Sequence, residues 1–303
     1  MAAARDFRMF FFAEAIFGNE FLQMRMKRGL DWNPKSKDAR ALMSRRHTTL
    51  TRVDAPATLR ADAPSARSLR TPRVALDQST LTNILLTLPV LLFALVAHEW
   101  AHAFAALKQG DPTAYELGRL TFNPIKHIDP FMTIILPIVM LAGSHGAIAL
   151  GGAKPCPVNP SKFRNYRRGD IIVSLAGVTM NLLLAILSAA LFMLVGVLGR
   201  AIPGGTPVFA ILQQMLQISV LYNSLLLFFN LLPIPPLDGS HVLAQFLPAS
   251  ISVPYKRVSR FGLLILVGLL YFGGDALNVL LSPVTLMAHA LMRPVLPFAL
   301  ELK

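Results

Sequence analysis

The sequence contains little cysteine and little charge, and both shortages narrow the class of protein. Cys156 is the single cysteine among 303 residues, so the chain cannot form an internal disulfide or a zinc cluster made of cysteines. Charged residues make up 15% of the chain, against about 25% in an average soluble domain. Hydrophobic residues make up 54%. This composition argues against a soluble globule and predicts a helical protein that crosses a membrane several times.

Acidic residues are scarce beside basic ones. The chain has 29 Lys and Arg residues and 16 Asp and Glu residues, which gives a formal net charge of +13. In a soluble protein such a charge would suggest a nucleic-acid partner. Here the basic residues lie in the N-terminal part and in short loops beside apolar runs, where membrane proteins carry them on the cytoplasmic side. We therefore expect a lipid bilayer as the partner of this chain and no nucleic acid.

The first 77 residues differ in composition from the rest. They are rich in Arg, Ala, Ser and Thr and have no sustained apolar period, a pattern typical of disorder. The sequence therefore predicts a disordered basic tail over residues 1–77 and a membrane-embedded domain over residues 78–303. We find no internal repeat and no linker that would divide this domain.

Apolar runs predict where the helices lie. Three of them are long enough to cross a hydrocarbon core of about 30 Å as helices, and they cover about residues 81–107, 171–198 and 208–232. Shorter runs cover about residues 131–142, 261–272 and 284–300. The run at 131–142 predicts either a short crossing or a re-entrant segment. The expected fold is an all-α bundle of about four to six transmembrane helices with a re-entrant segment.

The first long run contains the motif H-E-x-x-H, formed by His98, Glu99 and His102. On a helix, residues four apart point to the same side, so both imidazoles can bind one metal ion. Glu99 lies on a nearby face and can reach a metal-bound water without being a ligand. Because a charged residue at a helix centre costs about 2.5 to 3.5 kcal/mol on insertion, this cluster indicates a functional site. The alternative is a pair of interfacial histidines and a snorkelling glutamate without a metal.

A catalytic zinc site needs three protein ligands and one open position. Asp238 is the candidate for the third ligand, because it follows an apolar run and the proline-rich stretch Asn230-Leu-Leu-Pro-Ile-Pro-Pro-Leu-Asp238-Gly239. The prolines end the helix, and unwound backbone at membrane depth is tolerated where it is buried in protein or lines a cavity. Alone, this Asp-Gly pair indicates a turn. Together with H-E-x-x-H it predicts a third ligand.

These motifs resemble the signatures of the site-2 protease family of intramembrane zinc proteases, from about residue 84 to the C-terminus. The second signature is matched by Asn230, Pro233, Pro235, Asp238 and Gly239. A third family pattern is present as Ala176-Gly177-Val178-Thr179-Met180-Asn181, in which Val178 replaces the usual proline. The segments GDPTAYELGRLTFNPIKHIDP and GGAKPCPVNP are similar to the compact bacterial branch of the family. The sequence contains no region that resembles a PDZ or CBS domain.

The resemblance implies a zinc endopeptidase of the cell membrane, multi-pass and of the bacterial inner-membrane type, whose substrates are transmembrane proteins. In such an enzyme Zn²⁺ is held by His98, His102 and Asp238 and activates a water molecule, and Glu99 is the general base. Asn181 is expected to contact the oxyanion or the substrate backbone, or else to form an interhelical hydrogen bond. Asn230 is expected to orient the substrate or to cap the broken backbone.

Two other functions are compatible with the same metal ligands. One is a membrane protein that binds or transports zinc, and the other is a catalytically silent scaffold. Glu99 favours the protease, because a transporter needs no base beside the first ligand. The presence of all four core residues argues against the silent scaffold.

A shared metal ion also predicts topology. His98 and His102 lie near the C-terminal end of one helix and Asp238 follows another, so the helices at 81–107 and 208–232 should run parallel and the helix at 171–198 antiparallel to both. Basic residues flank the connections before the second and after the third long helix; they are Lys154, Lys162, Arg164, Arg167, Arg168, Lys256, Arg257 and Arg260. Both connections are therefore expected on the cytoplasmic side, with the zinc close to that side.

Overall fold

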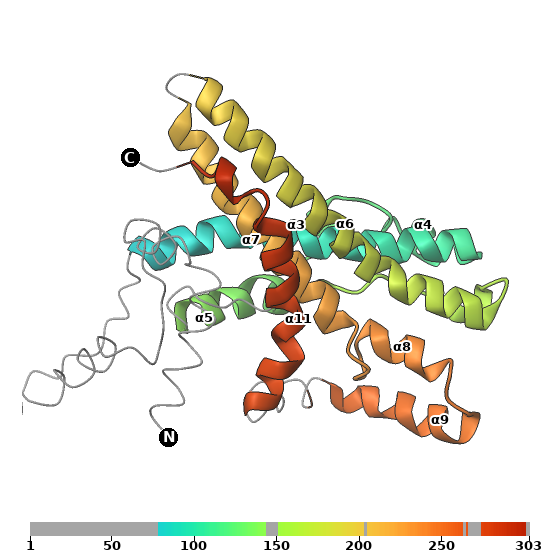
Figure 1. Cartoon of the computed structure of the whole chain (residues 1–303). Helices are drawn as coiled ribbons and strands as arrows, with labels where there is room; N and C mark the ends of the chain where they lie inside the picture. Colours follow the sequence, from blue (N-terminus) through green and yellow to red (C-terminus); the bar gives the residue numbers. More distant parts are fainter. Residues whose placement is uncertain (1–77, 144–150, 203–204, 263–264, 266–273, 301–303) are drawn as a thin grey trace, which may run out of the picture. The chain divides into compact units, whose positions relative to one another are not determined.

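The computed structural model describes residues 78–143, 151–202, 205–262, 265 and 274–300 (Figure 1). The predicted disordered tail and most of the predicted helix at 261–272 lie outside these residues. Within the described part of the chain, every regular element is a helix. The expectation of an all-α membrane protein is confirmed.

Three helices form the framework, and all three are long and apolar enough to cross a membrane. They are α3 (Gln78–Gln109), α6 (Tyr166–Ala201) and α7 (Thr206–Asn230), and they match the three long apolar runs of the sequence. Asn165 caps α6 by accepting a hydrogen bond from the backbone N–H of Arg168, as an N-cap asparagine commonly does. Helix α7 ends before the proline-rich segment, which cannot continue it.

The short run at 131–142 forms a π-helical turn, η2 (Pro130–Ile135), that continues into α5 (Leu136–Gly143). The Asp129 side chain begins this segment by accepting hydrogen bonds from the backbone of Phe131 and Met132. The segment is shorter than the about 20 residues that a crossing needs. A re-entrant course and a short crossing both stay predictions for it.

The last helix differs from its predicted bounds. We expected it to begin near residue 284, but α11 spans Gly274–Met292 and carries Pro283 inside it. Helix α11 therefore continues through Pro283 rather than beginning after it. Shorter elements complete the fold; they are α4 (Thr113–Glu116), η1 (Pro124–Lys126), η3 (Pro160–Lys162), α8 (Asp238–Ala244), α9 (Ala249–Arg257), η4 (Val258–Phe261) and η5 (Leu296–Phe298).

Apolar contacts hold the helices together. One buried cluster joins α3, α7 and α11 and includes Leu91, Leu225 and Val284. A second joins α6, α7 and α11 and includes Phe192 and Val220. Elsewhere α6 exposes leucines along its outer face, among them Leu183, Leu187 and Leu194. Exposed leucines in such numbers fit a helix that faces lipid rather than water.

Helix directions follow the order that a shared metal ion requires. In Figure 1, α3 and α7 run toward the same end of the bundle. Helix α6, which lies between them in the chain, runs in the opposite direction. The C-terminal part of α3 and the segment that follows α7 therefore meet. The side of the membrane on which they meet stays a prediction.

Candidate metal centre

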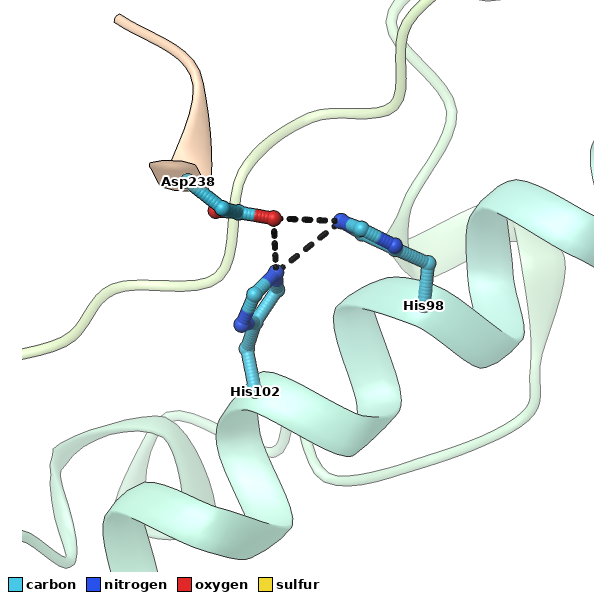
Figure 2. Close-up of side chains that lie close together, drawn as sticks. All are labelled: His98, His102 and Asp238. Atoms are coloured by element: carbon cyan, nitrogen blue, oxygen red, sulfur yellow. Dashed lines mark hydrogen bonds and ion pairs between the residues drawn. The ribbon is translucent and has the colours of Figure 1, made fainter. Parts of the chain in front are cut away.

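Two imidazoles and one carboxylate form a compact group in the core of the bundle (Figure 2). His98 Nε2 and His102 Nε2 lie 2.9 Å apart. Asp238 Oδ2 lies 3.2 Å from the first of these nitrogens and 3.3 Å from the second. His98 and His102 are 6% and 9% exposed. We call these three residues the metal cluster.

The metal cluster fits a zinc ion by geometry and by donor chemistry. With bonds of about 2.0–2.1 Å, tetrahedral ligand atoms lie about 3.3 Å apart, close to the three separations seen here. Asp238 Oδ2 is buried and, beside the two imidazole nitrogens, has no polar partner among the described residues, so a bound cation would complete its contacts. Burial raises the pKa of Asp238, but the nearby His102 and His98 side chains bring it below its usual value. The carboxyl is therefore ionised and suited to a cation at neutral pH.

Gly177 of α6 makes room for both imidazoles. A Cβ atom at this position would lie 2.5 Å from His102 Nε2 and 2.5 Å from His98 Cε1. Real Cβ atoms do not approach other atoms so closely, so a larger residue would displace the histidines. This position belongs to the Ala176–Asn181 pattern noted in the sequence, and it shows what the glycine of that pattern does here.

Asp238 is placed by the unwound chain between α7 and α8. It is the first residue of α8, and the next residue, Gly239, lies so close to the backbone carbonyls of Leu231 and Leu232 that a side chain would not fit. At the other end of α8, the Gln245 side chain donates a hydrogen bond to Asp170 of α6. His241 Nδ1 lies 3.7 Å from the same carboxylate. His241 thus contacts Asp170, and the two ends of α8 are both anchored.

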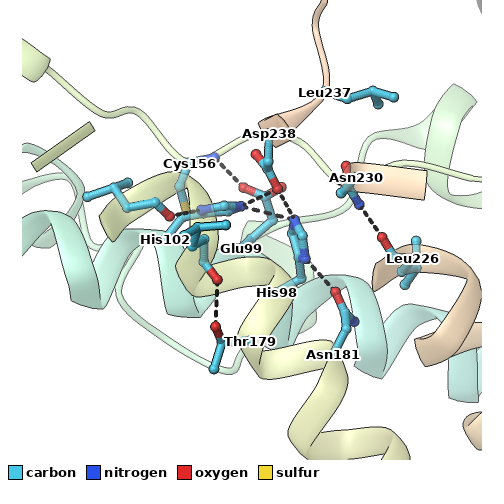
Figure 3. A network of polar contacts seen from close by, with 12 residues as sticks. His98, Glu99, His102, Cys156, Thr179, Asn181, Leu226, Asn230, Leu237 and Asp238 are labelled. Carbon is cyan, nitrogen blue, oxygen red and sulfur yellow. Dashed lines mark hydrogen bonds and ion pairs between the residues drawn. The ribbon is translucent and has the colours of Figure 1, made fainter. Parts of the chain in front are cut away.

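The second nitrogen of each imidazole meets an oxygen atom of α6. His102 Nδ1 lies 2.7 Å from the backbone oxygen of Val173, and His98 Nδ1 lies 2.6 Å from Asn181 Oδ1 (Figure 3). Metal-binding histidines commonly donate their free N–H in this way, which fixes the ring and leaves the other nitrogen for the metal. Helix α6 thus orients both rings.

The two asparagines that we expected near the substrate take part in hydrogen bonds within the protein. Asn181 is fully buried, and its Nδ2 donates to Asn223 of α7 at 2.9 Å. This is the interhelical arrangement that we had weighed against an oxyanion role. Asn230 Nδ2 donates to the Leu226 carbonyl of its own helix at 2.9 Å (Figure 3). Contacts of these two residues with a substrate stay predictions.

Glu99 projects from α3 and contacts the loop between α5 and η3. Its Oε2 accepts a hydrogen bond of 2.7 Å from the backbone N–H of Cys156, in the loop formed by residues 151–159, which we call the 151–159 loop. Burial, followed by the charge of Glu99, raises the pKa of the Cys156 thiol to about 12. The thiol therefore stays protonated at neutral pH. Both the backbone N–H and the thiol of Cys156 interact with Glu99.

Two buried charged residues hold the 151–159 loop, one at its middle and one at its end. Arg119 donates from Nη2 to the backbone oxygens of Lys154 at 2.8 Å and Pro155 at 3.3 Å. Asp111 is fully buried and accepts a hydrogen bond of 2.6 Å from the backbone N–H of Asn159. These two side chains hold the loop in the position from which Cys156 reaches Glu99.

Sequence reasoning overlooked four residues of this site. Asn223 could have been found as a polar residue inside an apolar helix, and Gly177 as part of a quoted pattern. Arg119 and Asp111 lie in the connection after α3, where charged residues are common. Nothing in their spacing indicates that they bind the 151–159 loop.

Comparison with known proteins agrees with this geometry. The family model described as Peptidase family M50 matches residues 86–273. A protein of Bacillus subtilis (strain 168) named "Putative zinc metalloprotease YwhC" is 37% identical over 175 residues, which cover 58% of this chain and 75% of that protein. Similarly, "Putative zinc metalloprotease Rip2" of Mycolicibacterium smegmatis is 32% identical over 179 residues, or 59% of this chain and 64% of that one. No solved structure matches the chain.

The matched residues include His98, Glu99, His102, Asn181 and Asp238, so the family match covers the whole metal cluster. More than half of the chain lies within it. The protein therefore belongs to peptidase family M50, the site-2 protease family, and is a zinc metalloprotease.

Proposed function

We propose that this zinc metalloprotease is an intramembrane endopeptidase of a bacterial cell membrane, which it crosses several times. Its substrates are partner proteins with a transmembrane segment, cut in or near that segment. The observation that carries this proposal is the position of the metal cluster. His98 and His102 lie in α3, within a span apolar and long enough to cross a membrane, so a substrate must reach them at membrane depth.

In this proposal His98, His102 and Asp238 hold the zinc ion. Zinc, when bound, polarises the scissile carbonyl and makes water a better nucleophile. Glu99 takes the proton of the attacking water and passes it to the leaving amine. Glu99 follows His98 directly in the sequence, which brings its carboxylate near the metal cluster. The hydrogen bond from the Cys156 backbone N–H then holds the carboxylate there.

The asparagines have separate roles. We assign to Asn181 the orientation of His98, which its Oδ1 contacts at 2.6 Å. Nδ2 of Asn181 carries two hydrogens, and it donates one of them to Asn223. The other hydrogen is the one that would contact the oxyanion or the substrate backbone. Asn230 lies at the end of α7, next to the unwound segment that leads to Asp238, and this place favours contact with an extended substrate.

Two other functions compete with this one: a membrane protein that binds or transports zinc, and a catalytically silent scaffold. Both would use the metal cluster without hydrolysis. Glu99 and its contact with the 151–159 loop favour the protease. Neither alternative requires a carboxylate that lies next to the metal ligands and does not itself bind the metal.

Proteoliposomes that contain the purified protein test this proposal. One substrate would be a single-span membrane protein, and its matched control would be the same extramembrane part without the span. We expect the enzyme to cut the first inside or beside its apolar segment, as mapped by mass spectrometry, and to leave the second intact. Glu99→Gln and His98→Ala should cut neither. Cleavage of the control alone, or full activity of Glu99→Gln, would contradict the proposal.

A further inference from the structure

A chain of buried polar groups leads from the metal cluster into the interface between α6 and α7. It begins at His98 Nδ1, which lies 2.6 Å from Asn181 Oδ1, as Figure 3 shows. Asn181 Nδ2 then donates to Asn223 Oδ1 at 2.9 Å. Asn223 Nδ2 donates to the backbone oxygen of Ser219 at 2.9 Å and to its hydroxyl at 3.1 Å. Asn181 and Asn223 are 0% and 1% exposed.

The last member of this chain fixes the direction of every hydrogen bond in it. A backbone carbonyl can only accept, so the atom of Asn223 that faces the Ser219 carbonyl must be the amide nitrogen. The amide oxygen of Asn223 consequently faces Asn181, which must present its nitrogen there. The oxygen of Asn181 then faces His98 Nδ1, and this nitrogen must carry the hydrogen.

This direction decides which nitrogen of His98 can bind a metal. A neutral imidazole with its hydrogen on Nδ1 keeps its lone pair on Nε2. Nε2 is the atom that lies 3.2 Å from Asp238 Oδ2 and 2.9 Å from His102 Nε2. If the amide of Asn181 were reversed, its nitrogen would face Nδ1. The hydrogen of His98 would then sit on Nε2, where it would block the metal.

His102 needs no such relay. Its Nδ1 lies 2.7 Å from the Val173 carbonyl, which can only accept, so one contact fixes the tautomer. His98 instead meets a side-chain amide, which can face it with either end at almost the same shape. Its tautomer is secure only while a further group prevents Asn181 from reversing.

We propose that Asn223 is a positioning residue of the metal centre, whose amide fixes the orientation of Asn181 and, through it, the metal-binding tautomer of His98. This proposal rests on the proposed role of His98 as a ligand. Asn223 touches neither the metal cluster nor a substrate in this scheme. Its effect reaches the metal through Asn181 alone.

Zinc affinity of the purified full-length protein, measured by competition with a chelator, tests the proposal. Asn223→Leu removes the acceptor that faces Asn181, and we expect zinc affinity to fall by about 10- to 100-fold, the usual effect of losing a residue that orients a ligand. Asn223→Asp still offers an oxygen to Asn181 Nδ2 and should recover most of the lost affinity. Asn223→Ala repeats the first test if the leucine variant does not fold.

Gln213→Leu is the matched control. Gln213 is another buried amide of α7, 3% exposed, and it bonds to the Phe192 and Phe298 carbonyls and not to the metal cluster. Loss of this amide should lower the melting temperature but not the zinc affinity. The visible spectrum of the cobalt-substituted protein gives a second readout, which should change in Asn223→Leu and not in Gln213→Leu.

The outcomes separate this inference from the proposed function. If His98→Ala loses zinc while Asn223→Leu binds it as the parent does, the relay is wrong and the ligand assignment stands. Equal losses of affinity in Asn223→Leu, Asn223→Asp and Gln213→Leu would also overturn the relay, because the effect would then be one of general packing. If His98→Ala keeps its zinc, the ligand assignment itself fails.

Discussion

On one side of the metal centre, helices position the two histidines of the metal cluster; on the other, a loop holds Glu99. His98 and His102 project from one helix, and oxygens of α6 orient both rings. Glu99 projects from the same helix, but its partner is the backbone N–H of Cys156 in the 151–159 loop. Two neighbouring residues of α3, His98 and Glu99, thus depend on different parts of the protein.

The difference has a physical reason. Zinc binding requires three atoms at fixed separations, and two of them come from imidazoles that close-packed helices hold rigidly. The proposed proton transfer by Glu99 requires space for water and substrate beside the carboxylate, and loops commonly provide such space. We therefore expect changes on the helix side to affect zinc content, and changes on the loop side to affect hydrolysis while zinc stays bound.

The largest effect is expected from the ligands themselves. His98→Ala and His102→Ala each remove one of the three proposed protein ligands, so we expect zinc content to fall from about one ion per chain to almost none. Metal analysis of the purified variants measures this. His289→Ala, which changes a histidine of α11 outside the metal cluster, is the control and should keep its zinc.

Gly177→Ala should have the next largest effect. Its Cβ would overlap both imidazoles, and we expect zinc affinity to fall by about 10- to 100-fold because overpacking of this kind costs about 1 to 3 kcal/mol. Gly196→Ala, on the same helix, would also clash, with Gln213 and the Phe298 carbonyl. It should destabilise the protein without changing zinc affinity. Equal zinc affinities in the two variants would contradict the claim that the helix packing around Gly177 positions the zinc-binding histidines.

Arg119 tests the loop side. Arg119→Met removes the hydrogen bonds to the Lys154 and Pro155 carbonyls, each worth about 1.5 to 3 kcal/mol for a charged donor. We expect kcat/KM to fall by roughly tenfold and zinc content to stay the same. Arg119→Lys keeps one charged donor but cannot reproduce the planar fork, so its activity should lie between the two. Loss of zinc in Arg119→Met would contradict the separation between zinc binding by the helix side and hydrolysis supported by the loop side.

Asp111 gives the smallest expected effect, and one that depends on pH. Burial raises the pKa of Asp111, but hydrogen bonds from Thr113 and Asn159 and the charge of Lys162 bring it below its usual value. Its stabilising contribution is therefore present at neutral pH and is lost as the pH falls below about 4, toward the lowered pKa. Asp111→Asn should lower the melting temperature at pH 7 and reduce its dependence on pH below 4. An unchanged pH profile would show that Asp111 does not hold the loop through its charge.

Much of the helix side could be predicted from the sequence. Apolar runs gave α3, α6 and α7 to within a few residues, since burial in lipid demands such runs. The H-E-x-x-H spacing placed His98 and His102 on one face, and the prolines before Asp238 indicated the unwound chain that carries it. Local rules suffice where one helix, or its end, determines the geometry.

The loop side could not be predicted in the same way. Cys156 is 57 residues from Glu99, and it contributes a backbone N–H, which every residue except proline has. Arg119 and Asp111 likewise bind backbone atoms of the 151–159 loop. On the helix side, Asn223 and Asn181 meet across two helices, and no spacing rule within one helix relates them either. Contacts between distant segments, made through backbone groups, leave little trace in a single sequence.

Zinc content and cleavage of a membrane substrate, measured on the same purified preparation of Glu99→Gln, test the separation most directly. Glutamine keeps the shape of the Glu99 side chain and removes the proposed base. We predict about one zinc ion per chain, as in the parent, and hydrolysis slower by about 10²- to 10⁴-fold, the usual contribution of a general base. A variant that cleaves as fast as the parent, or that loses its zinc, would contradict the account.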